Sequence, residues 1–142
     1  MREIRYRAYI KNLEGLNKPF FEERGRMYDV ETIDFEQKEV TIRCPSELYF
    51  RFEDIVLMQY TGLKDKNGVE IYEGDIVNVE LPEKNDFKAD VQWHNSGWCF
   101  DLGDECYEIN EYLDLDCKWH SFVTVEVIGN IHQHQELLKE NK

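Results

Sequence analysis

The sequence of 142 residues lacks a long uninterrupted apolar segment. A membrane-spanning helix requires about 20 predominantly apolar residues, and charged side chains interrupt this sequence far more often than that. The first seven residues include three arginines and a glutamate, so they do not form the apolar segment of a secretory signal peptide. These absences predict an intracellular protein without a membrane partner.

Basic side chains are also scarce. The chain has 17 Lys and Arg residues but 30 Asp and Glu residues, which gives a formal net charge of −13. This balance opposes the phosphate contacts that drive non-specific nucleic-acid binding, and it repels anionic lipid headgroups. We therefore expect no general nucleic-acid binding.

Apolar material is sufficient for a core. Hydrophobic residues make up 42% of the chain and aromatic residues 13%. Apolar residues recur mostly at a spacing of two, in stretches rich in β-branched and aromatic residues, as in antiparallel strands with one buried face. The ranges predicted as strands are 3–9, 27–33, 40–43, 76–81, 87–93, 98–102 and 122–131. Phe87, Ala89, Val91 and Trp93 are expected to face inward, and with a turn at Asn95-Ser96-Gly97 the ranges 76–81, 87–93 and 98–102 are expected to form a meander. Short strands and tight turns after about residue 70 predict a small closed barrel.

Other segments carry other patterns. Residues 13–25 are rich in Gly, Asn, Pro and charge, and they predict a long loop anchored by two adjacent phenylalanines. Residues 48–60 mix apolar periods and fit a helical turn followed by a strand. Helical spacing of apolar residues predicts a short helix near 106–115, and a second helix is expected at the C-terminus. The predicted fold class is mainly β with a minor α contribution.

Three stretches of the sequence resemble the YopX family of phage and prophage proteins. They are Leu57–Gly68, Ile71–Val77 and Glu126–Ile131, and the opening residues Met1–Ala8 are similar to the N-terminus of that family. Relative to many members the chain inserts residues 13–24, whose role is left open. The resemblance implies a β-rich fold with an SH3-like barrel, self-association with a trimer as one arrangement, and action in the cytoplasm of a bacterial host cell. It implies no catalytic residue.

The resemblance and the strand pattern together predict a single domain over residues 1–142. Within it, N-terminal strands and a loop occupy residues 1–60, and an SH3-like barrel of antiparallel strands occupies residues 61–131. A terminal helix is expected over residues 132–142.

The segment from Tyr60 to Val77 has the densest group of turn signals in the chain and forms the first candidate site. Its glycines permit positive φ angles, and Lys64, Asp65, Lys66 and Asn67 are expected to project into solvent. The segment is either a partner-binding loop or a set of turns that opens the barrel, and the turn chemistry of Asn67-Gly68 favours the second interpretation. The candidate interaction residues are Tyr60, Gly62, Lys64, Asp65, Asn67, Gly68, Tyr72, Gly74 and Asp75.

An acidic segment forms the second candidate site. Seven Asp or Glu residues and no Lys or Arg lie between residues 101 and 116, whereas residues 1–26 carry a net charge of +3. This polarity favours docking of the basic N-terminal strand of one subunit against the acidic face of another, weakened by salt. The candidate subunit contacts are Arg2, Arg5, Arg7, Asp101, Asp104, Glu105 and Glu108. A solvated acidic face is the alternative.

Patterns for metal binding and catalysis are weak. The four cysteines, Cys44, Cys99, Cys106 and Cys117, are expected to be reduced, and Cys99 is expected in the core. A zinc site from Cys99, Cys106, Cys117 and His120 has one close ligand pair where two are usual, and the acidic segment lacks a calcium-loop pattern. No serine lies in a nucleophile motif. We predict no metal, no cofactor, no catalytic residue and no enzymatic activity.

The leading hypothesis is a non-enzymatic phage-encoded protein that self-associates and binds a protein of the host or of the phage. An acidic nucleic-acid mimic that binds a host DNA-binding protein is the first alternative. Direct nucleic-acid contact by the N-terminal arginines and aromatic residues of the barrel is the second, and a small hydrolase or metal-dependent enzyme is the third. The sequence identifies no partner.

Overall fold

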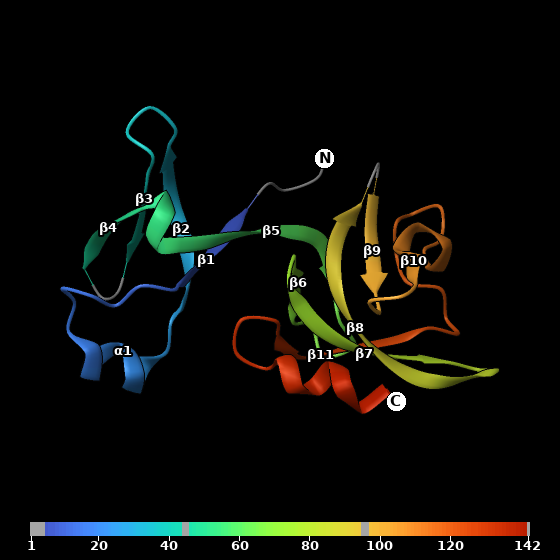
Figure 1. The fold of residues 1–142 in the computed structure, drawn as a ribbon. Helices are drawn as coiled ribbons and strands as arrows, with labels where there is room; N and C mark the ends of the chain where they lie inside the picture. Colours follow the sequence, from blue (N-terminus) through green and yellow to red (C-terminus); the bar gives the residue numbers. More distant parts are fainter. Residues whose placement is uncertain (1–4, 44–45, 95–96, 142) are drawn as a thin grey trace. The chain divides into compact units, whose positions relative to one another are not determined.

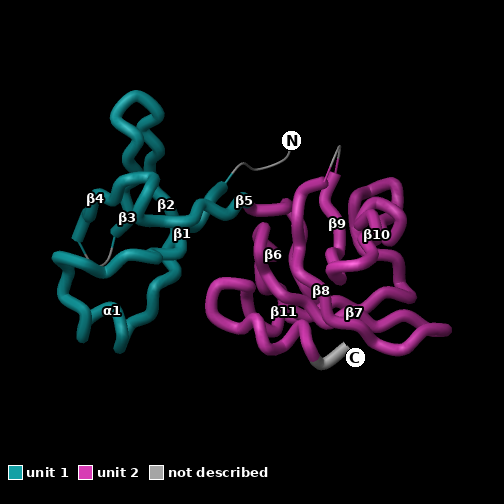
Figure 2. Tube along the Cα trace, viewed as in Figure 1, with its two compact units in different colours: residues 1, 3–59 teal, residues 2, 60–142 magenta. Residues whose placement is uncertain are grey.

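The structure is a computed structural model that describes residues 5–43, 46–94 and 97–141. Contacts within the chain divide it into two compact units, coloured separately in Figure 2. Unit 1 contains the described residues up to Gln59, and unit 2 contains those from Tyr60 onward. No helix in the described ranges is long and apolar enough to cross a membrane.

Unit 1 is built on antiparallel strands (Figure 1). Its elements are β1 (Tyr6–Ile10), α1 (Lys18–Arg24), β2 (Met27–Asp34), β3 (Glu39–Arg43), β4 (Glu47–Arg51), the 3-10 turn η1 (Phe52–Asp54) and the first half of β5 (Ile55–Lys64). The strand order is β4-β3-β2-β1-β5, and β5 continues into unit 2, where it pairs with β6 (Glu70–Tyr72).

The core of unit 1 lies on one face of this sheet. Alternation along the strands buries Ala8 and Ile10 of β1, Val40 and Ile42 of β3, and Phe50 of β4. The period of two read from the sequence is therefore confirmed in β1, whereas β3 also buries Thr41 and β4 comes from a segment whose apolar periods are mixed.

The segment predicted as a long loop contains the α-helix α1, so the loop prediction is wrong there. Asn17 caps the helix because its side chain accepts a hydrogen bond from the Phe20 backbone N–H, and a proline occupies the first turn, where it costs no helical hydrogen bond. Phe21 is buried and packs edge-to-face against Tyr28 and Phe50. A cap, a proline and one buried aromatic side chain thus make a helix from a polar segment.

Unit 2 contains a five-stranded antiparallel sheet with the order β10-β9-β8-β7-β11. Its elements are β7 (Asp75–Leu81), β8 (Lys84–His94), β9 (Gly97–Asp101), β10 (Cys106–Glu108), the 3-10 turn η2 (Ile109–Tyr112), β11 (Thr124–Asn130) and the 3-10 turn η3 (Gln135–Asn141). The predicted meander of three consecutive strands is confirmed as β7, β8 and β9.

The core of unit 2 follows the predicted alternation in most of β8. Phe87, Ala89 and Val91 are buried, together with Phe100 of β9, whereas Trp93, also predicted to face inward, is 47% exposed. Trp93 instead packs edge-to-face against Trp98, with the ring centroids 5.0 Å apart. The expected burial is therefore wrong for Trp93, whereas Trp98, its partner across the two strands, is buried.

The predicted fold class is confirmed as mainly β, with two antiparallel sheets, one α-helix and short 3-10 turns among the described residues. Of the short helix or helical turn predicted near residues 106–115, the structure has the 3-10 turn η2 after the strand β10, and the C-terminal segment forms η3. In the described part of unit 2, β10 and β11 are the two ends of the sheet order, so a closed barrel stays a prediction.

Candidate functional site

One face of β8, β9 and β10 carries polar side chains. Residues that pair across antiparallel strands point to the same face, and so do residues two apart along a strand. Asp101 pairs with both Asp90 and Cys106, and Cys99 pairs with Glu108. We call this surface the polar face, and its members are Asp90, Gln92, His94, Cys99, Asp101, Cys106 and Glu108. The opposite face of the same strands contributes to the core of unit 2.

An open cavity of about 420 Å³ lies at the polar face. Its lining contains no Lys or Arg among the described residues, and it includes all four acidic residues that the sequence indicated as a subunit contact. The lining residues are His94, Cys99, Asp101, Gly103, Asp104, Glu105, Cys106 and Glu108. We call this cavity the acidic pocket. Asp104, Glu105 and Glu108 are exposed, so their carboxylates keep their solvation and are accessible to a ligand.

Asp101 lines the pocket, and Asp90 pairs with it across β8 and β9 on the polar face. Nε2 of His94 lies 3.1 Å from Oδ2 of Asp101. Burial and, after it, the nearby Asp101 carboxylate raise the pKa of Asp90 above that of an ordinary aspartate, against a lowering effect of the hydrogen bond that Gln92 donates to it at 2.7 Å. Negative charge is therefore crowded here, and a cation bound beside these carboxylates would relieve the repulsion.

The Cys106 thiol of the pocket is a poor nucleophile. Partial burial, a hydrogen bond with Cys99 and the carboxylates of Asp101 and Asp90 raise the pKa of Cys106 to about 12. Cys99 is buried, as expected, and its thiol points toward the Gly97 carbonyl at 3.9 Å. Because the thiolate is the reactive species, this environment opposes covalent chemistry at Cys106 near pH 7.

The zinc ligands considered in the sequence lie in two different places. Cys99 and Cys106 belong to the polar face, whereas Cys117 and His120 lie in the segment between η2 and β11. The His120 ring stacks on Phe122, with the centroids 5.1 Å apart. Within the described residues, no group of three or more His, Cys, Asp or Glu side chains is arranged to hold a metal ion.

Asp65 of the first candidate site is buried, so the expectation that it projects into solvent is wrong. Its Oδ1 accepts hydrogen bonds from the backbone N–H groups of Asn67 (2.8 Å) and Val69 (2.9 Å), and its Oδ2 accepts one from Val127 (2.9 Å). The carboxylate thus ties the turn at residues 65–69 to β11. Lys64, by contrast, is exposed as expected.

The rest of the first candidate site is divided between buried and exposed positions. Tyr60, Tyr72, Gly74 and Asp75 are buried, and Asp75 accepts a hydrogen bond from the Tyr72 backbone N–H at 2.8 Å. The three glycines, Gly62, Gly68 and Gly74, have positive φ angles of 88°, 80° and 86°. Exposed members are Gly62, Lys64, Asn67 and Gly68. This geometry favours the interpretation in which the segment mainly builds turns.

The basic half of the predicted subunit contact is less accessible than expected. Arg2 lies outside the described residues, and Arg5 and Arg7 are half-buried. The Nε atoms of Arg5 and Arg7 are shielded from solvent. These two arginines are therefore only partly accessible to a second subunit.

Sequence reasoning missed the contribution of β8 to the polar face. Asp90, Gln92 and His94 alternate with the buried Ala89 and Val91, so the period of two already indicated their common direction. Their proximity to the acidic segment depends on the pairing of β8 with β9, and the Asn95-Ser96-Gly97 turn signal between the two strands was the clue to that register.

Comparisons with known proteins agree with this fold. The profile of the YopX protein family matches residues 6–139. The crystal structure of protein EF1440 from Enterococcus faecalis is similar to this structure, with a TM-score of 0.58 and 24% sequence identity, over 97% of this chain and 99% of that chain. At this identity the likeness concerns the fold alone. No curated protein matches the sequence.

Proposed function

Because this chain belongs to the YopX family, we propose that it is a non-enzymatic, self-associating protein-interaction module of phage or prophage origin. It acts in the cytoplasm of a bacterial cell, where the acidic pocket binds a basic segment of a partner protein. One observation carries this proposal: Asp101, Asp104, Glu105 and Glu108 line a single open cavity whose described lining has no basic side chain of Lys or Arg.

The charge of unit 2 supports a basic partner. Residues 60–142 contain seven Lys or Arg residues and 18 Asp or Glu residues, a net charge of −11, whereas residues 1–59 contain ten and 12, a net charge of −2. A field of one sign speeds the encounter with a partner of the opposite sign and disfavours acidic competitors. Unit 2 is therefore suited to select for basic surfaces.

The chemistry of the pocket supports binding rather than catalysis. His94 and Asp101 form an acid–base pair, but the pocket thiol Cys106 is neutral near pH 7 and offers no activated nucleophile. The exposed carboxylates accept hydrogen bonds from Lys or Arg side chains, which is the chemistry of a docking site.

The arrangement of the carboxylates favours a protein segment over the groove of a DNA-binding protein as the partner. A nucleic-acid mimic needs carboxylates spaced along a surface as phosphates are spaced along a strand. Here four of the seven acidic residues of the segment gather around one cavity. A compact basic segment matches this geometry better than an extended basic cleft.

The strand connections of unit 2 support an SH3-like barrel. The backbone N–H of Lys66 donates to the Val125 carbonyl at 2.9 Å, and Asp65 accepts from Val127 in the same strand. The end of β5 and the turn that follows it therefore cover the free edge of β11, as the closing of a small barrel requires.

Titration with a short peptide rich in lysine and arginine tests the pocket. Binding at low salt is expected to weaken several-fold in the double variant Asp104→Asn/Glu108→Gln, which removes two exposed carboxylates of the lining. The matched control Glu14→Gln/Glu36→Gln neutralises two exposed carboxylates of unit 1. Equal binding by the two double variants, or no binding by the wild type at low salt, would overturn the proposal.

A further inference from the structure

The strand β4 is the outer edge of its sheet. It ends the strand order and pairs with β3, and among the described residues no other strand pairs with it. Leu48 and Phe50 point toward the core of unit 1, while Glu47, Tyr49 and Arg51 point to the exposed face. An edge strand presents backbone N–H and C=O groups that can pair with another strand.

The sequence of β4 is complementary to itself when read in opposite directions. The strand reads Glu-Leu-Tyr-Phe-Arg from Glu47 to Arg51. An antiparallel copy centred on Tyr49 therefore places Glu47 opposite Arg51 of the other copy, and Leu48 opposite Phe50, on both sides of a two-fold axis. Each pair joins opposite charges or two apolar side chains, which are the favourable cross-strand combinations.

Other arrangements of two β4 strands are less favourable. A parallel pair in register places Glu47 opposite Glu47 and Arg51 opposite Arg51, and like charges directly opposite each other destabilise a sheet. A shift by one residue moves Leu48 and Phe50 to the face opposite the core. The antiparallel register centred on Tyr49 alone matches both the charges and the apolar face.

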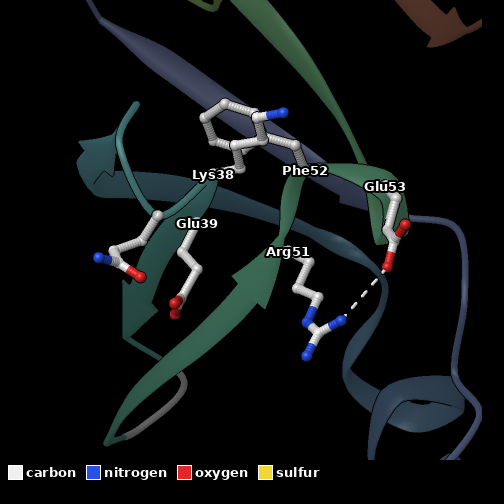
Figure 3. A pocket seen from close by; sticks show the side chains of 6 residues that line it. Lys38, Glu39, Arg51, Phe52 and Glu53 are labelled. Carbon is white, nitrogen blue, oxygen red and sulfur yellow. Dashed lines mark ion pairs between the residues drawn. The ribbon is translucent and has the colours of Figure 1, made fainter.

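The side chains that such a pairing needs are accessible. Tyr49 is 64% exposed, and the side chains of Glu47 and Arg51 are 44% and 76% exposed. The hydroxyl of Tyr49 donates a hydrogen bond to Oε1 of Glu47 at 2.6 Å, within the same strand. The ion pairs are longer, at 3.8 Å from Arg43 to Oε2 of Glu47 and 3.6 Å from Arg51 to Glu53, so they compete weakly with new partners. Figure 3 shows Arg51 extending from the edge strand beside an open cavity of about 440 Å³, with its dashed contact to Glu53.

The internal ladder of unit 1 already uses the same charge pattern. In the pairing of β4 with β3, Glu47 lies opposite Arg43, and Arg51 lies opposite Glu39. A second β4 on the open side repeats this alternation with Arg51 and Glu47 of the other copy. The edge charges, which on other proteins prevent pairing, are here of opposite sign and arranged to permit it.

We propose that β4 is the self-association surface of this protein, where it pairs antiparallel with β4 of a second copy around a two-fold axis through Tyr49. This inference rests on the self-association part of the proposed function and assigns it a surface and a symmetry. The two half-sheets join edge to edge, so each copy contributes the same five residues. Because so short an edge buries a small area, the dimer is weak and depends on protein concentration.

Charge-reversal variants test the register. Glu47→Arg places two positive side chains opposite each other in each charge pair, and Arg51→Glu places two negative ones there, so each single variant is expected to weaken the dimer about tenfold or more. The double variant Glu47→Arg/Arg51→Glu restores opposite charges across the axis and recovers the dimer. An equimolar mixture of the two single variants forms a mixed dimer. Analytical ultracentrifugation over a range of concentrations measures all four samples.

Matched controls distinguish the effect of the β4 charges on dimerisation from an effect of the net charge of the protein. Glu36→Arg and Lys18→Glu make the same kind of charge reversal at exposed positions of unit 1 outside β4, and they are expected to dimerise like the wild type. Circular dichroism verifies that every variant is folded.

The outcomes distinguish the surface from self-association itself. A dimer that persists unchanged in both single variants contradicts the role of β4 and leaves the self-association of the proposed function standing. A wild type that stays monomeric at every concentration contradicts both. Recovery in the double variant and in the mixture, with loss in the single variants, establishes the antiparallel register.

Discussion

The outer strand β11 of unit 2 and the outer strand β4 of unit 1 differ in whether another segment covers their open edge. In unit 2, the turn at residues 65–69 covers β11, because the Lys66 backbone bonds to Val125 and the Asp65 carboxylate bonds to Val127. In unit 1, β4 has a partner strand on one side, and the described residues supply none on the other. A covered edge is not available to pair with another chain, so of these two strands β4 is the one that fits the pairing proposed above.

The two units also differ in net charge. Residues 60–142 carry a net charge of −11, so two acidic pockets repel each other, whereas residues 1–59 carry −2 and allow close approach of two copies. The difference in charge is consistent with the two proposals: pairing of copies through the nearly neutral unit, and binding of a basic partner by the acidic one.

The largest expected effect comes from the anchoring of α1 in unit 1. Phe21→Ala removes a buried ring that packs on Tyr28 and Phe50, and we expect a loss of about 3–5 kcal/mol in the free energy of unfolding. Denaturant titration followed by far-UV circular dichroism measures it. All three tryptophans lie in unit 2, so tryptophan fluorescence follows that unit in the same samples.

Phe20→Ala is the matched control for this prediction, because Phe20 is half-buried and lies beside Phe21 in the helix. Its expected loss is smaller. Equal losses for the two variants would show that α1 is not anchored by Phe21 in particular.

The next effect breaks the covered edge of unit 2. Asp65→Ala leaves the backbone N–H groups of Asn67, Val69 and Val127 without their acceptor, and we expect a loss of about 3 kcal/mol in the free energy of unfolding. Thermal and denaturant unfolding of unit 2, followed by tryptophan fluorescence, measures this loss.

Asp114 offers a matched control within the same unit. It makes the same local turn, since its Oδ1 accepts hydrogen bonds from the backbone N–H groups of Asp116 and Lys118, but it is exposed. Asp114→Ala is expected to cost less than Asp65→Ala. A loss as large at Asp114 would mean that the turn itself, rather than its link to β11, stabilises the edge.

A pH-dependent effect arises at the polar face. Burial, followed by the Asp101 carboxylate, raises the pKa of Asp90, so the folded state favours the protonated carboxyl group. The free energy of unfolding therefore decreases as the pH rises from the ordinary pKa near 3.8 through the raised pKa. An asparagine side chain has no charge to bury, so Asp90→Asn is expected to be more stable than the wild type at pH 7. The advantage should shrink toward low pH, below the ordinary value, in thermal unfolding. The same difference at both pH values would contradict this explanation.

Much of the fold was readable because strands show a simple period. The alternation along β7 and β8 and the turn signals between strands gave the meander, and the acidic segment gave most of the pocket. The helix α1 was missed because its signal lay in one cap, one proline and a phenylalanine pair rather than in a repeating apolar stripe.

Burial by long-range contacts was not predictable from the turn chemistry. Asp65 looked like an exposed loop residue, because Asp favours turns whether or not it is buried. Its third hydrogen bond reaches Val127, which is 62 residues away in the sequence. Similarly, no local signal showed that Arg5 and Arg7 are half-buried.

The smallest expected effect concerns Lys66, where the contribution of the backbone N–H to the covered edge of β11 can be measured apart from that of the side chain. Lys66 forms an exposed ion pair with Glu126 at 3.1 Å, and solvent screens such pairs. Lys66→Ala keeps the backbone N–H that bonds to Val125, so its unfolding midpoint should match that of the wild type. Lys66→Pro removes that N–H and should lower the midpoint. If the alanine variant instead falls as far as Asp65→Ala, side-chain charge rather than backbone pairing closes the edge, and the contrast with β4 would be one of charge alone.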